Sequence, residues 1–180
     1  YAVSRAACDL HLRSFFRAYG FPVVWTRSAN VYGPSQQLYR AIPRAMLAAR
    51  LGRQFYLHGG GHSVRSFIHI DDVMSATKNV MEDGLPGHEY HISTTESLSI
   101  RQLVARIADV MEVKYSSFVV EAEDRLGKDH SYLLKTDKIR QAFGWTDTIT
   151  IETGLRDTLY WIDSNLHELS SLSSEYIHKR

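Results

Sequence analysis

The first residues whose types and spacing could do chemistry are Tyr1 and Arg5. Apolar side chains recur at helical spacing up to Gly20, which predicts a helix over residues 2–19. Residues four apart share one face of a helix. A cation beside a phenol favours the phenolate, so this pair could supply a general base near neutral pH. The spacing alone leaves open an ordinary exposed pair at the start of a helix.

A second polar segment, Arg27-Ser-Ala-Asn30-Val-Tyr-Gly-Pro34, follows a predicted strand. We expect residues 30–34 to form a loop, and loops after strands are where α/β proteins bind ligands. A purely structural turn is the alternative.

A third segment runs Gly59-Gly-Gly-His-Ser-Val-Arg65-Ser-Phe-Ile-His-Ile-Asp-Asp72. Glycines let a backbone approach a ligand closely, and an arginine can grip a phosphate with two parallel hydrogen bonds. The spacing is neither that of a P-loop nor the G-x-G-x-x-G of a dinucleotide site. The alternative for Arg65 is a surface ion pair with Asp71 or Asp72.

A fourth segment, Asp124-Arg-Leu-Gly-Lys128-Asp-His130, contains cationic side chains that would suit an anionic ligand. The alternative is an ordinary solvated loop, which can have the same composition. The nine histidines show no H-E-x-x-H spacing, so we expect no metal site. No G-x-S-x-G elbow is present, which argues against a serine hydrolase.

The elements that must position these residues alternate between helices and short strands, which predicts an α/β fold. Besides the first helix, we expect helices over 43–51, 71–81, 100–111, 137–143 and 150–166. Strands are expected over 23–26, 55–58, 64–70, 89–92 and 115–120, with a loose tail after residue 169.

Composition narrows the function classes. Lys+Arg number 21 against 20 Asp+Glu, so the net charge of +1 gives no electrostatic case for a nucleic-acid partner. The single cysteine excludes an internal disulfide, and no run of about 18 apolar residues predicts a membrane span. With no signal peptide at the start, we expect a cytoplasmic protein. Because the first residue is Tyr1 rather than Met, we expect a processed chain or a piece of a longer one.

The order of these motifs, closed by Lys138-Ile-Arg-Gln-Ala-Phe-Gly-Trp145, resembles the second half of an extended short-chain dehydrogenase/reductase. Within that family the chain is most similar to nucleotide-sugar 4,6-dehydratases of the dTDP-glucose type, to about Trp161. The resemblance implies the C-terminal part of a Rossmann-type α/β fold with its substrate-binding subdomain. Residues 1–35 would end the NAD-binding domain, 36–169 would mainly bind the nucleotide sugar, and 170–180 would form a tail.

The resemblance also implies roles for individual residues. Tyr1 and Arg5 match the catalytic tyrosine and the lysine beside it, which holds the nicotinamide ribose, and the backbone of Val31 faces the cofactor. The positions that match substrate contacts are Asn30, Arg40, Ala41, Tyr56, His58, Arg65, His91, Asp124, Arg125 and Lys128. Three positions depart from the pattern: Arg5 replaces lysine, His91 replaces asparagine and Lys128 replaces histidine. Arginine is not interchangeable with lysine, because its planar fork is larger and its pKa too high for a proton relay.

The resemblance implies that a glycine-rich unit for the NAD pyrophosphate, a threonine and an Asp-Glu pair stand upstream of Tyr1. It further implies a homodimer, a nucleotide-diphosphate sugar as substrate, and NAD as cofactor, bound mainly by that upstream half. The expected function is therefore part of a nucleotide-sugar 4,6-dehydratase, with this chain inactive alone. Two alternatives stay open: a 4-epimerase of the same family, or a catalytically silent nucleotide-sugar-binding module.

Overall fold

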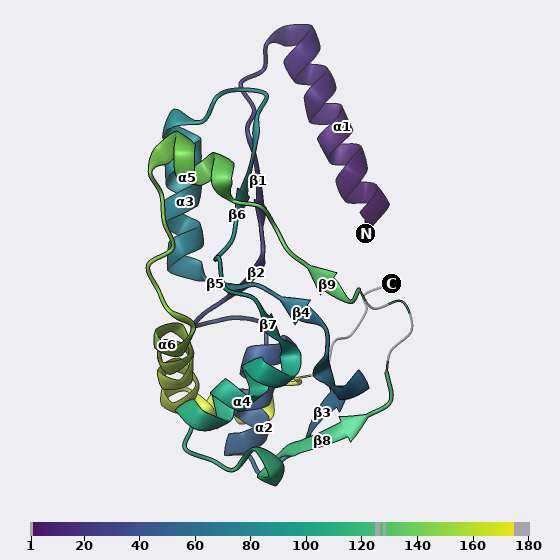
Figure 1. Cartoon of the computed structure of the whole chain (residues 1–180), viewed down its shortest axis with the longest axis vertical. Helices are drawn as coiled ribbons and strands as arrows, with labels where there is room; N and C mark the ends of the chain where they lie inside the picture. Colours follow the sequence, from purple (N-terminus) through teal and green to yellow (C-terminus); the bar gives the residue numbers. More distant parts are fainter. Residues whose placement is uncertain (1, 125–126, 128, 175–180) are drawn as a thin grey trace.

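The computed structural model describes residues 2–124, 127 and 129–174. Helices and short strands alternate in an elongated α/β molecule (Figure 1). The helices are α1 (Ala2–Tyr19), α2 (Ala41–Arg50), α3 (Ile70–Asp83), α4 (Ile100–Val110), α5 (Asp137–Phe143), α6 (Ile151–Ser164) and α7 (Leu166–Ser171). The strands are β1 (Trp25–Ser28), β2 (Asn30–Tyr32), β3 (Phe55–His58), β4 (Val64–Arg65), β5 (Phe67–His69), β6 (Glu89–Ile92), β7 (Leu98–Ser99), β8 (Val119–Ala122) and β9 (Ser131–Tyr132).

The strands pair mostly in parallel between segments far apart in the chain. β1 pairs with β6, β2 with β5 and β3 with β8, all parallel, while β4 lies between antiparallel β7 and parallel β9. None of the helices in the part of the chain that the structure describes has the length and apolarity that a membrane crossing requires.

Two hydrophobic cores lie at opposite ends of the molecule. The lower core in Figure 1 packs α2, α4 and α6 with β3 and β8, around side chains such as Met46, Leu103 and Leu155. The upper core packs α3 and α5 against β1 and β6, around Val80 and Ile92. The central strands β2 and β5 contribute to both cores, since Tyr32 on β2 belongs to the lower core and Ile68 on β5 to the upper one.

Several predicted elements differ from the observed ones. The strand expected over 23–26 is β1 at 25–28, because pairing with β6 begins only at Trp25. The predicted loop over 30–34 begins with a strand, β2, that pairs with β5. Helix α2 begins at Ala41 rather than at Pro43, and the start of the strand expected over 115–120 is a 3₁₀ turn at Tyr115–Ser117.

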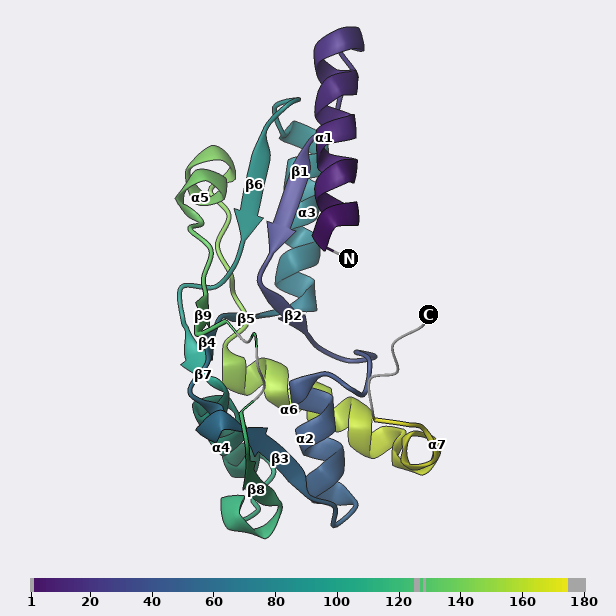
Figure 2. The ribbon, with the colours of Figure 1, turned by 90° about the vertical axis from the view of Figure 1, so that its right-hand side faces the viewer.

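Helix α1 is attached to the rest of the molecule mainly by charged side chains. It has no buried residue, and Figure 2 shows it standing beside β1 and projecting beyond it. The guanidinium of Arg13 lies 3.0 Å from the carboxylate of Glu89 on β6 and 4.8 Å from the ring centre of Trp25. Arg27 on β1 forms an ion pair with Asp9.

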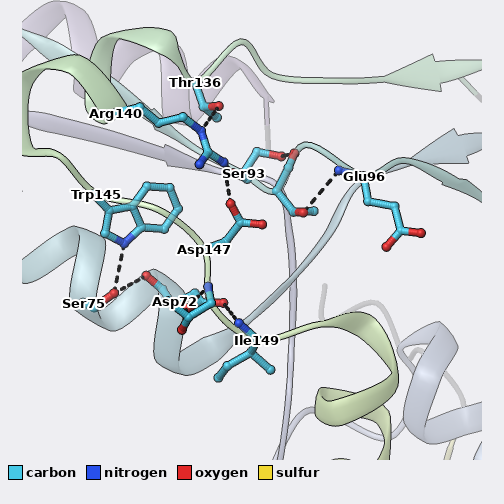
Figure 3. A network of polar contacts seen from close by, with 11 residues as sticks. Asp72, Ser75, Ser93, Glu96, Thr136, Arg140, Trp145, Asp147 and Ile149 are labelled. Atoms are coloured by element: carbon cyan, nitrogen blue, oxygen red, sulfur yellow. Dashed lines mark hydrogen bonds and ion pairs between the residues drawn. The ribbon is translucent and has the colours of Figure 1, made fainter.

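A partly buried polar network fixes the segment that joins α5 to α6 (Figure 3). Arg140 on α5 contacts the hydroxyl of Thr136, the carbonyl of Ser93 and the carboxylate of Asp147. Burial raises the pKa of the Asp147 carboxyl, but hydrogen bonds from Arg140 and Thr94 outweigh burial, so its pKa lies below the ordinary value. The network therefore ties the end of β6 to the α5–α6 connection.

Replacing Arg140 with methionine is expected to lower the free energy of unfolding by about 1–2 kcal/mol at pH 7. The loss is smaller than for a fully buried ion pair, because the side chains of Arg140 and Asp147 both retain some solvent contact. A carboxyl with a depressed pKa stabilises the fold above its unfolded pKa of about 3.9, and this contribution is lost as the pH falls. The difference from wild type should therefore narrow below about pH 4 in urea titrations at several pH values. As a control, Arg156→Met at an exposed position should change the free energy of unfolding little. If the stability lost in Arg140→Met did not change with pH, the role given to Asp147 would be contradicted.

Candidate functional site

A cavity of about 710 Å³ lies where the ends of β1 and β2 meet β4, β5 and the first turn of α2. Five of the residues proposed for the site from the sequence line it: Asn30, Val31, Arg40, Ala41 and Arg65. They come from three segments of the chain that are up to 35 residues apart. The carboxyl ends of parallel strands are the usual ligand-binding edge of such sheets, and this cavity lies at that edge of β1.

Asn30 and Val31 are positioned by the pairing of β2 with β5. The backbone N–H of Asn30 and its side-chain amide both donate to the carbonyl of Ser66, each at 3.2 Å. The chain then turns at Gly33, whose φ of +147° is one that other residues rarely adopt. A side chain there would also begin 2.7 Å from Ile70, so glycine lets β2 turn directly over the start of α3.

Arg65 is held by backbone carbonyl groups. Its guanidinium donates to the carbonyl of Val64 at 2.8 Å and to that of Asp129 at 2.9 Å. The alternative ion pair with Asp71 or Asp72 is wrong. Asp72 is 3% exposed and its oxygens accept from Thr148 and Ile149, while the carboxylate of Asp71 lies 3.6 Å from the ring of His69. A guanidinium fixed in this way keeps its charge beside the cavity without a carboxylate to neutralise it among the described residues.

Arg40 and Ala41 bring the start of α2 to the cavity. Arg40 is exposed, precedes the helix in an extended conformation, and lies 5.4 Å from the ring centre of Tyr39. No side chain among the described residues caps the first N–H groups of α2. The positive end of the helix dipole and the Arg40 charge together favour an anion at this position.

Three other proposed residues lie on the β3–β8 pair and do not line this cavity. The hydroxyl of Tyr56 donates to Gln54 at 3.0 Å, and the Nδ1 atom of His58 lies 3.0 Å from the carbonyl of Glu123. The carboxyl of Asp124 lies against Gly59, whose φ is +57° and where a side chain would overlap it. His58 and Asp124 thus lie at the carboxyl ends of β3 and β8, and Tyr56 lies on β3 two residues before His58.

His91 and Arg5 are also apart from the cavity. His91 lies on β6 in a second, more open cavity with Lys135, Asp137 and Lys138. Arg5 is exposed on α1. Tyr1, Arg125 and Lys128 lie outside the described residues.

The sequence reasoning missed Ser28, Ser35 and Gln36, which also line the cavity. A polar run directly after a Gly-Pro turn was the available signal, but such runs are common in loops without function. No group of three or more metal-ligating side chains occurs among the residues that the structure describes.

Comparison with known proteins places this chain in a family. The model of the GDP-mannose 4,6 dehydratase family matches residues 1–158. The chain belongs to this family. It is 33% identical over 172 residues to dTDP-D-glucose 4,6-dehydratase from Homo sapiens, covering 93% of this chain and 49% of that protein. It is 29% identical to dTDP-glucose 4,6-dehydratase 1 from Escherichia coli K12, covering 97% of this chain and 50% of that protein.

The chain therefore spans about half the length of the curated family members it matches. Among solved structures it is similar to DesIV, a dTDP-glucose 4,6-dehydratase from Streptomyces venezuelae with NAD and TYD bound. That match has a TM-score of 0.87 and 33% identity and covers 93% of this chain and 52% of DesIV. A UDP-glucose 4-epimerase from Thermotoga maritima gives a TM-score of 0.86 at 26% identity, covering 92% of this chain and 54% of the epimerase. The fold is thus shared by dehydratases and epimerases.

Proposed function

We propose that this chain is the sugar-nucleotide-binding part of an NAD-dependent nucleotide-sugar 4,6-dehydratase. The observation that carries the proposal is the cavity that gathers Asn30, Arg40 and Arg65. Residues 1–35 would complete the NAD-binding domain and residues 36–169 would mainly bind the nucleotide sugar. The identity to dTDP-glucose 4,6-dehydratases and the similarity to DesIV support this reading.

The cavity has the chemistry that a sugar diphosphate needs. Two guanidinium groups, on Arg40 and Arg65, and the positive end of α2 attract the diphosphate. The amides of Asn30 and Gln36 suit sugar hydroxyls. We assign Tyr56, His58 and Asp124, at the ends of β3 and β8, to the nucleotide portion, with Arg125 and Lys128 in the segment that follows and His91 as a further substrate contact.

Val31 and Arg5 are the residues of this chain that we assign to the nicotinamide end of NAD. Val31 lines the cavity at the ligand-binding edge of the parallel strands, where dinucleotides bind in related sheets. Arg5 would hold the ribose from α1. When bound, NAD supplies an acceptor and later a donor for one hydride.

Within the proposed reaction the residues of this chain have three tasks. The Tyr1 phenolate takes the proton of the sugar C4 hydroxyl, and the Arg5 charge favours that phenolate. Arg65 and Arg40 hold the diphosphate, so that C4 stays within reach of the phenol. Oxidation at C4 acidifies the C5 proton, which allows water to leave across C5 and C6.

The proposal includes a homodimer, a cytoplasmic location and a place in carbohydrate biosynthesis. The exposed apolar side chains of α1, with Val3 at 84% and Leu10 at 66% exposure, support a partner surface on that helix.

A 4-epimerase would use the same phenol and the same cavity, and the similarity to the Thermotoga maritima enzyme supports it as a second candidate. A dehydratase product loses one water from the substrate, whereas an epimerase product keeps its mass. Mass spectrometry of the product from a protein that contains this chain separates the two, and no conversion of a bound nucleotide sugar would indicate a silent binding module.

Replacing Arg65 with alanine tests the binding site directly. The affinity for a nucleoside-diphosphate sugar should fall by about 1.5–3 kcal/mol, the contribution of a hydrogen bond to a charged group. The free energy of unfolding should change little, since among the described residues the Arg65 guanidinium donates to two backbone carbonyls and forms no ion pair. Calorimetric titration with dTDP-glucose, UDP-glucose and GDP-mannose measures the affinity and identifies the preferred base.

Arg53→Ala is the matched control, because Arg53 is an exposed arginine after α2 that contacts the carbonyl of Ser170 instead of the cavity. Arg65→Lys keeps the charge but loses the two-pronged contact, so it should recover only part of the affinity. Equal affinities for wild type and Arg65→Ala, with both proteins folded, would remove Arg65 from the site.

A further inference from the structure

A buried histidine, His69, lies directly behind one wall of the cavity. Its side chain is 2% exposed, at the junction where β5 ends and α3 begins. Its ring meets the ring of Tyr32 edge-on, with 5.4 Å between the ring centres. Tyr32, Gly33 and Ile70 line the cavity, and we call these three residues the cavity wall. His69 contacts this wall from behind and does not itself line the cavity.

The two ring nitrogens of His69 face different parts of the molecule. Nδ1 accepts a hydrogen bond from the backbone N–H of Asp71 at 3.4 Å, which caps the start of α3. A ring nitrogen that accepts carries no proton, so the proton of the neutral ring is on Nε2. The carboxylate of Asp157 on α6 lies 3.2 Å from Nε2. No group among the described residues is aligned with Nε2 as a hydrogen-bond partner, so the attraction between His69 and Asp157 is electrostatic.

Two glycines let the chain approach the His69 ring closely from two sides. A side chain at Gly33 would begin 3.2 Å from Nε2, and one at Gly154 would begin 2.9 Å from Cδ2 and overlap the hydroxyl of Tyr32. Gly33 belongs to the cavity wall, whereas Gly154 belongs to α6, the helix that carries Asp157. The ring of His69 therefore fills the space between α6 and the cavity wall.

This packing links α6 to the affinity of the cavity. A site binds more tightly when it is already held in its bound arrangement, because less has to be ordered on association. The cavity wall rests on the His69 ring, and the charge of Asp157 attracts that ring toward α6. Neither His69 nor Asp157 lines the cavity, so each can affect a ligand only through the wall.

We propose that His69 is a positioning residue that, together with Asp157, holds the cavity wall in the arrangement that binds the nucleotide sugar. This inference rests on the proposed function and extends it to a helix outside the cavity. It predicts that a change on the solvent side of α6 alters affinity for the nucleotide sugar, and does so only while His69 is present.

The experiment changes both ends of the contact between His69 and Asp157. His69→Phe keeps an aromatic ring but has neither nitrogen, and His69→Gln keeps an N–H donor near the place of Nε2. Asp157→Asn removes the charge of a side chain that is 49% exposed. The matched control is Glu152→Gln on the same helix, since Glu152 is 50% exposed and forms an ion pair with Arg106 instead.

Each variant, the double variant of His69→Phe with Asp157→Asn, and wild type are titrated calorimetrically with dTDP-glucose, UDP-glucose and GDP-mannose. Thermal unfolding gives an assay temperature at which all of them are folded. At that temperature a purely structural role of His69 would leave the affinity unchanged, since lower stability alone does not alter binding by molecules that are folded.

For the sugar nucleotide that wild type binds best, we expect His69→Phe to bind about tenfold more weakly. Asp157→Asn should bind about two- to fivefold more weakly, as for a partly exposed ion pair. His69→Gln should recover part of the affinity, and Glu152→Gln should match wild type. Because Asp157 acts through His69, Asp157→Asn should have no further effect in combination with His69→Phe.

Wild-type affinity in either His69→Phe or Asp157→Asn would overturn the inference. An equal loss from Asp157→Asn with and without His69→Phe would also overturn it, as would an equal loss from Glu152→Gln. All of these outcomes leave the proposed function standing. A folded wild-type protein that binds none of the three sugar nucleotides would overturn the proposed function, and this inference with it.

Discussion

Replacing Asp72 with alanine is expected to lower the free energy of unfolding by about 3–5 kcal/mol, because three donors lose a charged acceptor inside the protein. Asp72 lies in the first turn of α3 and is 3% exposed. Its carboxylate accepts hydrogen bonds at 2.9–3.0 Å from the backbone and hydroxyl of Thr148 and from the backbone of Ile149. The carboxylate therefore fixes the chain just before α6, and urea unfolding monitored by circular dichroism measures the loss.

Asp71 provides the matched control for Asp72. It stands in the same turn of α3, but its side chain is 73% exposed and lies 3.6 Å from the ring of His69. Asp71→Ala should therefore cost less than about 1 kcal/mol, as for other surface ion pairs. Asp72→Asn should recover only part of the stability, because one of its atoms becomes a donor that faces another donor. A loss at Asp72 no larger than that at Asp71 would show that the α3–α6 connection does not depend on this carboxylate.

The second large effect is expected at Tyr1. In a protein that contains this chain and turns over a nucleotide sugar, Tyr1→Phe should lower kcat by about 10²–10⁴-fold, the usual contribution of a general base. The phenylalanine keeps the ring but cannot take a proton. Steady-state rates with the nucleotide sugar that binds best, together with its affinity, separate a lost base from lost binding.

Arg5→Lys is the companion to Tyr1→Phe. A lysine offers a compact ammonium where arginine has a planar fork, and it is the residue that the family resemblance leads us to expect. The lysine variant should keep or raise kcat. Near-normal turnover by Tyr1→Phe would show that another group takes the C4 proton.

Much of the secondary structure was predictable because it depends on local signals. α1, β3, β6 and α5 begin and end at the predicted residues. The helix after Ser99 has the capping box that Ser99 and Gln102 allow. Helical periodicity, capping residues and terminal glycines act within a few residues, so the sequence shows them directly.

The elements that were wrong or missed depend on distant partners. β7 and β9 have two residues each and exist because both pair with β4, more than 30 residues away. The same reason explains β2, which was expected as a loop and is a strand because β5 lies beside it. The sequence of a strand of two or three residues does not show which distant segment it pairs with.

The order of the motifs along the chain made part of the candidate site predictable. Asn30, Val31, Arg40, Ala41 and Arg65 line one cavity, and their roles in binding stay predictions. The partners of Arg65 were not predictable, since the carbonyl of Asp129 reaches it only through the pairing of β4 with β9. Gln36 was missed because its hydrogen bond to the Val31 carbonyl depends on the fold of the turn, which the sequence does not show.

The way α1 is attached implies that this helix can open locally while the rest of the chain stays folded. A single helix of 18 residues is only marginally stable in water, and α1 has no buried side chain to support it. Its ion pairs with Glu89 and Arg27 are partly exposed, so dissolved salt weakens them. Local opening of α1 therefore needs less free energy than unfolding of either core, and the two differ in their dependence on ionic strength. The helix that carries the proposed Arg5 contact is thus less protected than either core of the described chain, and the cavity at β1 and β2 can remain folded while α1 opens.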